Sequence, residues 1–168
     1  MTLANVLTII RILLIPVFVA VFLWESAGGR YLSVGVLLLS GLTDVLDGYI
    51  ARARHQVSKL GKILDPVADK LFALAVLGAL VAARELPLWI LVALALKEVI
   101  QLFGGGLLWL SRKNTLGASN IGKAATFLLY AGVIAVILGF SFGPAMVIAA
   151  VAVSFVAGLG YLRQIVSS

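Results

Sequence analysis

Six long apolar runs fill most of this 168-residue chain and constrain its fold more than any other feature. Hydrophobic residues make up 62% of the sequence and charged residues 12%, far from the composition of soluble domains. The mean hydropathy is +1.16. Because a membrane-spanning helix needs about 20 apolar residues, the length accommodates about six spans and no separate soluble domain. We therefore expect an all-α integral membrane protein with six transmembrane helices, forming a single domain over residues 1–168.

The expected spans follow the apolar runs along the chain. They cover residues 4–24, 31–51, 66–83, 87–110, 118–140 and 144–162. Pro66, Pro87 and Pro144 stand where we expect helices to begin, because the first helical turn does not need the backbone donor that proline lacks. Within the first run, Arg11 and the lack of an amino-terminal basic cluster favour a retained helix over a signal peptide.

Positive charge is distributed unevenly between the connections. Basic residues gather after the second and fourth expected spans and at the carboxyl end, at Arg52, Arg54, Lys59, Lys62, Arg112, Lys113, Lys123 and Arg163. The opposite connections hold only Arg30 and Arg84. Since basic residues near span ends are retained in the cytoplasm, we expect both termini to be cytoplasmic, in a bacterial cytoplasmic membrane. The formal net charge of +6 then reflects this bias and anionic headgroups, and no nucleic-acid partner is expected.

Four of the seven acidic residues fall between positions 44 and 69. Asp44 and Asp47 are three residues apart and Asp65 and Asp69 four apart, so on helices each pair projects from one face. Four such carboxylates would repel one another and be costly to desolvate unless cations lay between them. Two Mg²⁺ or Mn²⁺ ions would balance their charge, and zinc is disfavoured because the chain has no cysteine and a single histidine.

Glycine and arginine residues flank the aspartates. Gly48 follows Asp47, and Gly61 precedes Asp65 by four residues, so a bulky ligand could approach the backbone at both points. Close helix packing is the alternative for these glycines. Arg52 could hold a phosphate or anchor the helix end at the membrane surface. For the aspartates themselves, the alternative to metal binding is helix capping or pairing with basic neighbours.

Together these residues resemble the signature of the CDP-alcohol phosphotransferase family, D-x2-D-G-x2-A-R-x8-G-x3-D-x3-D. Every fixed position is matched, at Asp44, Asp47, Gly48, Ala51, Arg52, Gly61, Asp65 and Asp69. The resemblance implies transfer of a phosphatidyl group from CDP-diacylglycerol to an alcohol, with release of CMP. It implies that the four aspartates hold two metal ions and that Asp69 is also the base. It assigns CDP binding to Asp44, Gly48, Arg52, Gly61 and Asp65.

The acceptor alcohol is less tightly specified. Resemblance to phosphatidylglycerophosphate synthases makes glycerol 3-phosphate the first expectation. Candidate residues for the acceptor or its phosphate are Asn5, Thr8, Arg11, Lys62, Lys97, Arg112 and Lys123. The chain departs from that pattern at Ala125, where a second lysine is frequent, and at Lys97, where arginine is common. A buried ion pair with Glu98 is the alternative for Lys97, and headgroup anchoring is the alternative for the loop cations.

Two further alternatives remain open. The segment 41–52 also resembles cardiolipin synthases that use CDP-diacylglycerol, whose acceptor is phosphatidylglycerol. A divalent-cation transporter is the alternative from another class, because acidic residues among membrane helices also form ion pathways. The absence of an evident inverted repeat and the clustering of carboxylates at one membrane face favour the enzyme. The resemblance also points to a homodimer.

Overall fold

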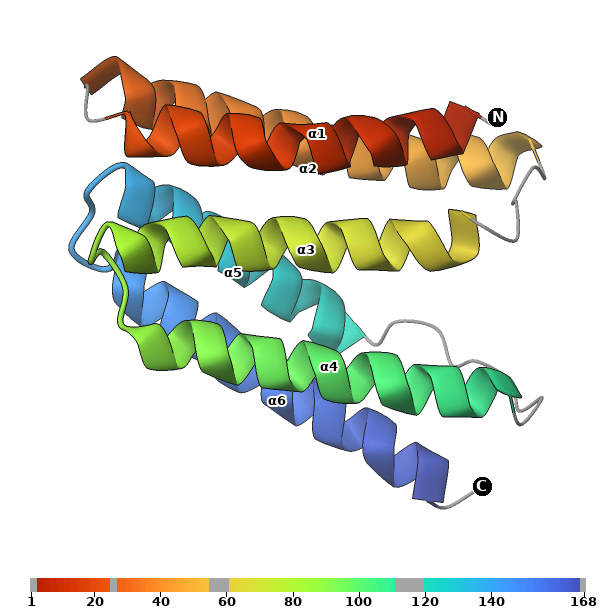
Figure 1. Ribbon diagram of the computed structural model, residues 1–168. Coiled ribbons are helices and arrows are strands. Elements are labelled where there is room, and N and C mark those ends of the chain that lie inside the picture. The colour runs from red at the N-terminus through yellow and green to blue at the C-terminus, as the bar shows by residue number, and fades with distance from the viewer. Residues whose placement is uncertain (1–2, 25–26, 55–60, 111–119, 167–168) are drawn as a thin grey trace. The chain divides into compact units, whose positions relative to one another are not determined.

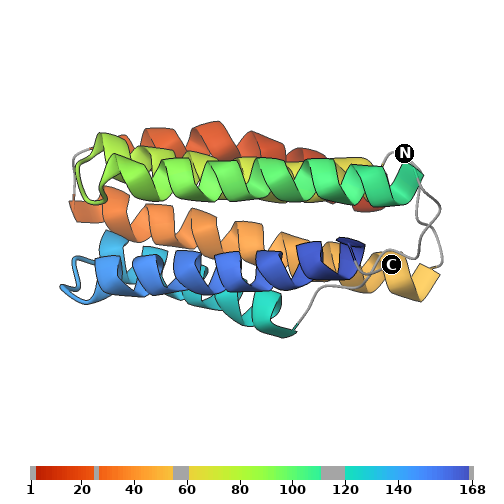
Figure 2. The same ribbon diagram turned by 90° about the horizontal axis from the view of Figure 1, so that it is seen from below.

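The computed structural model describes residues 3–24, 27–54, 61–110 and 120–166. These residues form six helices and no strand, so the all-α class and the helix count are confirmed (Figures 1 and 2). The helices are α1 (Leu3–Leu23), α2 (Ala27–Arg54), α3 (Gly61–Ala82), α4 (Leu88–Leu110), α5 (Asn120–Ile137) and α6 (Gly143–Val166).

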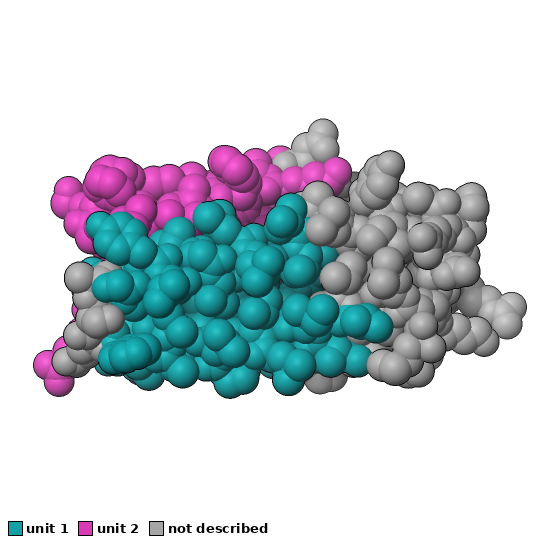
Figure 3. Space-filling model, turned by 90° about the horizontal axis from the view of Figure 1, so that it is seen from above, with its two compact units in different colours: residues 1–83 teal, residues 84–168 magenta. Residues whose placement is uncertain are grey.

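The chain divides into two compact units, residues 1–83 and residues 84–168 (Figure 3). In the first unit, α1 packs against both α2 and α3. In the second unit, α6 packs against both α5 and α4. Each unit is therefore a three-helix arrangement in which one helix contacts the other two.

Aromatic rings join α1 to α3 in the first unit. Phe18 and Phe22 lie one turn apart on α1, with ring centroids 5.8 Å apart. Phe18 also meets Phe72 of α3 edge to face at a centroid distance of 6.0 Å, and both of these side chains are fully buried. Such ring pairs add about 0.5–1.5 kcal/mol beyond the burial of their area. The cluster therefore fixes how far α1 is shifted along α3.

A Schellman motif ends α5 and turns the chain into α6. The Phe140 amide donates to the Ala135 carbonyl and the Gly139 amide donates to the Val136 carbonyl, each at 2.9 Å. Gly139 has a φ of 79°, a left-handed conformation that glycine adopts without a Cβ clash. The motif satisfies carbonyl groups that the end of the helix would otherwise leave without donors.

Two glycines allow the backbones of α5 and α6 to approach closely. A Cβ on Gly132 would lie 2.9 Å from the Val147 nitrogen, and a Cβ on Gly143 would lie 2.6 Å from the Val136 nitrogen. Both distances are shorter than real Cβ contacts allow. The α5–α6 pair therefore depends on the absence of side chains at these two positions.

The three prolines expected at helix starts give different outcomes. Pro87 directly precedes Leu88, where α4 begins, and Pro144 is the second residue of α6, so both predictions are confirmed. Pro66 lies five residues after the start of α3, so the prediction that it marks that start is wrong. Hydropathy marks where the apolar run begins, whereas α3 includes an additional polar turn that begins at Gly61.

Large apolar side chains are exposed on every helix. Examples between 48% and 77% exposed are Leu13, Leu38, Leu71, Leu96, Phe127 and Val156. Within the described ranges, no helix is both long enough and apolar enough to span a membrane. The predicted spans and their orientation therefore stay predictions.

Candidate active site

The two aspartate pairs lie on α2 and α3 at one end of the first unit. α2 ends, α3 begins and α1 begins at this end (Figures 1 and 2). Asp44 and Asp47 lie ten and seven residues before the end of α2, and Asp65 and Asp69 lie four and eight residues after the start of α3. At about 1.5 Å rise per residue, all four stand within roughly three turns of that end. The expectation that each pair lies on a helix is confirmed.

Of the four aspartates, Asp69 is the one whose side chain is described. It is half-buried and has at least one interaction partner. Among the side chains that the structure describes, no group of three or more acidic or histidine residues could hold a metal ion. The side chains of Asp44, Asp47, Arg52, Lys62 and Asp65, and the surroundings of Gly48 and Gly61, lie outside the described part. The proposed metal set therefore rests on the helix positions of its members and on their chemistry.

Buried hydroxyl groups continue the aspartate face along α2. Ser40 is 1% exposed and lies four residues before Asp44, so the two residues share a face. The Thr43 Oγ1 donates to the Ser40 carbonyl at 2.7 Å. The Ser40 Oγ has no hydrogen-bond partner among the residues that the structure describes. A buried hydroxyl without a hydrogen-bond partner lowers stability by about 1–3 kcal/mol. This face of α2 therefore suits a polar or ionic ligand that could supply the partner.

Ser40 was not among the expected site residues. A lone serine in an apolar helix carries a weak signal, because its hydroxyl often bonds to the backbone of its own helix, as the Ser33 Oγ does to the Arg30 carbonyl at 2.8 Å. The signal that could have identified Ser40 is its four-residue spacing from Asp44.

Two polar side chains of α1 are fully buried near the same end of the unit. Thr8 and Arg11 are each 1% exposed, and each has at least one interaction partner. They lie five and eight residues after the start of α1, and therefore at depths similar to those of the aspartates. The side chain of Asn5, the third candidate on α1, lies outside the described part.

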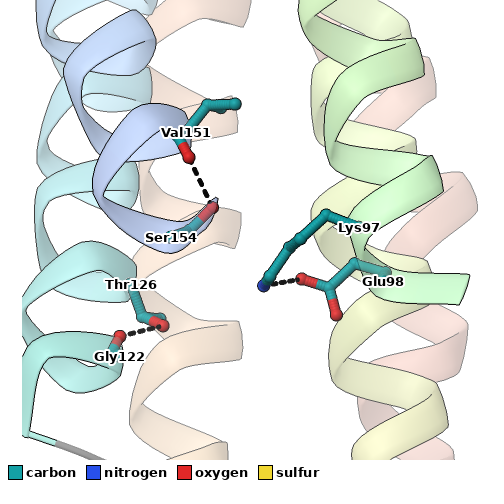
Figure 4. A network of polar contacts seen from close by, with 6 residues as sticks. All are labelled: Lys97, Glu98, Gly122, Thr126, Val151 and Ser154. Atoms are coloured by element: carbon teal, nitrogen blue, oxygen red, sulfur yellow. Dashed lines mark hydrogen bonds and ion pairs between the residues drawn. The ribbon is translucent and has the colours of Figure 1, made fainter. Parts of the chain in front are cut away.

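Three further acceptor candidates, Lys97, Arg112 and Lys123, belong to the second unit. The Lys97 Nζ and the Glu98 Oε1 form an ion pair at 2.6 Å, with each side chain 13% exposed, as the buried-pair alternative predicts (Figure 4). Lys123 is exposed near the start of α5, and Arg112 lies outside the described residues. Ala125, which stands where a second lysine is frequent, is 2% exposed. A buried alanine there cannot supply the cation of the glycerol-phosphate pattern.

Hydroxyl groups on α5 and α6 bond within their own helices (Figure 4). The Thr126 Oγ1 donates to the Gly122 carbonyl at 3.1 Å, and the Ser154 Oγ donates to the Val151 carbonyl at 2.7 Å. Ser154 is buried, and this bond satisfies its hydroxyl. These two hydroxyls are therefore accounted for by local structure.

Comparison with known proteins gives the context of this site. A cardiolipin synthase (CMP-forming) of Streptomyces coelicolor is 38% identical over 135 residues, which cover 78% of this chain and 63% of the relative. A Mycobacterium tuberculosis protein provisionally named cardiolipin synthase is 36% identical over 139 residues, covering 83% of this chain and 66% of the relative. This chain thus spans just under two thirds of the length of these two relatives.

A relative with a different name covers the chain to a similar extent. A CDP-diacylglycerol–glycerol-3-phosphate 3-phosphatidyltransferase of Rickettsia bellii is 34% identical over 145 residues, which cover 82% of this chain and 75% of the relative. The family model described as CDP-alcohol phosphatidyltransferase matches residues 1–156, far beyond the signature at 44–69. The chain therefore belongs to the CDP-alcohol phosphatidyltransferase family.

Proposed function

We propose that this chain transfers a phosphatidyl group from CDP-diacylglycerol to an alcohol and releases CMP. The observation that carries the proposal is the complete family signature on α2 and α3, with its aspartates near one end of the first unit. The family match crosses the boundary between the two units, which supports a single functional domain over residues 1–168.

We further propose that Asp44, Asp47, Asp65 and Asp69 hold two Mg²⁺ or Mn²⁺ ions. The donor set fits these ions, because it consists of carboxylate oxygens, the ligands that hard divalent cations prefer. The buried Ser40 hydroxyl one turn from Asp44 also fits a polar ligand on this face. When bound, the ions would neutralise negative charge on the donor diphosphate and on leaving CMP.

The chain's own residues then carry out the transfer. The Asp69 carboxylate takes the proton from the acceptor hydroxyl, whose oxygen attacks the phosphorus that bears diacylglycerol. The bond between this phosphorus and the oxygen shared with CMP breaks, and CMP leaves with the bonding electrons. Gly48 and Gly61 leave room at the backbone for cytidine and diphosphate, and Arg52 holds a phosphate.

Glycerol 3-phosphate is our proposed acceptor, and phosphatidylglycerol is the second candidate. The first is supported by the Rickettsia relative, of which this chain covers the larger share. The second is supported by the higher identity to the Streptomyces and Mycobacterium relatives and by the buried Ala125. Of the candidate acceptor residues, Asn5, Thr8, Arg11 and Lys62 lie in the same unit as the aspartates.

We also propose that the six helices lie in a bacterial cytoplasmic membrane, with both termini and the aspartate end facing the cytoplasm. The support is the 62% hydrophobic composition, the exposed apolar side chains on every helix and the positively charged connections. In this arrangement the acyl chains of the donor stay in lipid while its headgroup reaches the aspartates.

The test is CMP release by the purified chain in detergent with CDP-diacylglycerol and Mg²⁺. Glycerol 3-phosphate and phosphatidylglycerol are offered separately, so that the acceptor that supports turnover is identified. Asp69→Asn should lower the rate by at least about 100-fold, as expected for loss of a general base. Glu85→Gln makes the same chemical change outside the site and should keep the wild-type rate.

The enzyme proposal is overturned if no acceptor supports CMP release, and the assignment of Asp69 as the base is overturned if Asp69→Asn is as active as the wild type. A chelator should abolish the activity, and Mg²⁺ or Mn²⁺ should restore it; persistence with the chelator would contradict the metal site. Mg²⁺ efflux from liposomes without CMP release would instead support the transporter alternative.

A further inference from the structure

The buried guanidinium of Arg11 needs an explanation that the reaction itself does not supply. Arg11 is the largest fully buried side chain among the described residues and the only charged residue of α1. A guanidinium stays charged inside proteins, and a buried charge is strongly unfavourable unless an opposite charge compensates it. Arg11 has at least one interaction partner, and a compensating negative charge must come from an element that packs against α1.

The packing of α1 limits the choice of anion. α1 contacts α2 and α3, and the acidic residues of these two helices are the four signature aspartates. The remaining acidic residue of the first unit is Glu25, which in the sequence comes after the end of α1, whereas Arg11 lies twelve residues, or about 18 Å, before that end. The aspartate set is therefore the available source of a counter-ion for Arg11.

The ring contact between α1 and α3 sets the register of the two helices. Phe18 and Phe72 are in contact, and both helices begin at the same end of the unit (Figure 1). Arg11 lies seven residues before Phe18, and Asp65 lies seven residues before Phe72. In this register Arg11 is level with Asp65, and Asp69 follows one turn later.

We propose that Arg11 is an internal counter-charge of the four aspartates and acts as a positioning residue for the metal site. This inference rests on the proposed metal site. The guanidinium offsets the mutual repulsion of the carboxylates, and by the same Coulomb interaction it opposes the entry of divalent cations. Counting four aspartates, two metal ions and Arg11, the loaded site carries one net positive charge, which complements the anionic diphosphate of the donor.

Binding of Mn²⁺ to the purified chain without substrates tests this inference directly. Free Mn²⁺ is measured by electron paramagnetic resonance for the wild type, Arg11→Gln and Arg11→Lys. Loss of the positive charge in Arg11→Gln should tighten Mn²⁺ binding at least about tenfold, whereas Arg11→Lys, which keeps the charge, should bind as the wild type does. Arg30→Gln removes an exposed arginine of the same unit and should leave the affinity unchanged.

Thermal unfolding gives a second readout that a merely structural arginine would not share. With a chelator present, Arg11→Gln should have a lower Tm than the wild type, and saturating Mn²⁺ should remove most of the difference. If Arg11→Gln alone does not fold, the double variant Arg11→Gln/Asp65→Asn should recover folding, because it removes one repelling carboxylate. Failure of the double variant to recover would overturn the inference.

The outcomes separate this inference from the proposed function. An Arg11→Gln affinity for Mn²⁺ within twofold of the wild type, or weaker, overturns the counter-charge alone. Absence of Mn²⁺ binding by the wild type overturns the metal site and the inference with it. If Arg11→Gln raises the glycerol 3-phosphate concentration needed for half-maximal CMP release and leaves Mn²⁺ binding unchanged, Arg11 binds the acceptor phosphate and the counter-charge is overturned.

Discussion

At the scale of single residues, the ion pair between Lys97 and Glu98 lies within an otherwise uncharged helix. Lys97→Met removes the lysine from beside a largely buried carboxylate and should lower the free energy of unfolding by about 1–3 kcal/mol. Lys97→Met/Glu98→Gln removes both charges and should be less destabilised than the single variant. Denaturant unfolding in detergent micelles measures the stability of the two variants. An equal decrease in the free energy of unfolding in both would contradict the pairing.

Backbone conformation at Arg84 leads to a second prediction at this scale. Arg84 is exposed and has a φ of 60°, a conformation that costs a residue with a Cβ about 1–2 kcal/mol. Arg84→Gly relieves this strain but makes the unfolded chain more flexible. We therefore expect the free energy of unfolding to rise by a net amount of about 0.5–1 kcal/mol. Gly139→Ala, at a φ of 79°, makes the reverse change and should lower the Tm. A lower Tm for Arg84→Gly would contradict this account.

At the scale of elements, the contact between α5 and α6 depends on the missing side chain of Gly132. In Gly132→Ala the new methyl group would collide with the Val147 backbone, so the helices must separate at an expected cost of about 1–3 kcal/mol. Gly78→Ala in α3 is the matched control, because no atom lies within 4 Å of its Cβ position. The control should be neutral or slightly stabilised through helix propensity. Thermal melts of the two variants check the contrast, and equal Tm values would refute it.

Helix number was predictable from sequence, whereas some helix ends were not. The ends of α1 and α4 lie within one residue of the apolar runs 4–24 and 87–110. α2 starts four residues before the expected 31–51, because its glycine-containing first turn is helical although it is not strongly apolar. α5 ends three residues before the expected residue 140, because the Schellman turn at Gly139 stops the helix inside an apolar stretch. Hydropathy therefore located the helices, and local backbone geometry set their ends.

The candidate site was also predictable in part: the helix positions of its aspartates were, and the burial of neighbouring polar residues was not. Spacings of three and four residues placed Asp44, Asp47, Asp65 and Asp69 on helix faces, because such spacings match the helical repeat. The burial of Arg11 and Ser40 could not be predicted in this way. Their environment depends on which helices pack against α1 and α2, and a single sequence does not contain that information.

At the scale of the whole molecule, exposed apolar side chains on all six helices predict stable association with lipid. After expression in bacteria, the chain should stay in the membrane pellet when membranes are washed with carbonate at high pH. Detergent should release it, because micelles can cover the same apolar surface. A peripheral membrane protein from the same cells serves as the control that the wash removes. Recovery of the chain in the carbonate supernatant would contradict the membrane proposal.

The turn at Arg84 has a practical consequence for engineering the protein. It is exposed, and it separates two sets of three helices that each have their own internal packing. Breaking the chain or inserting a foreign domain at such a position interrupts no helix. A fluorescent reporter could therefore be inserted there, with the aspartate-bearing helices left intact in the first half.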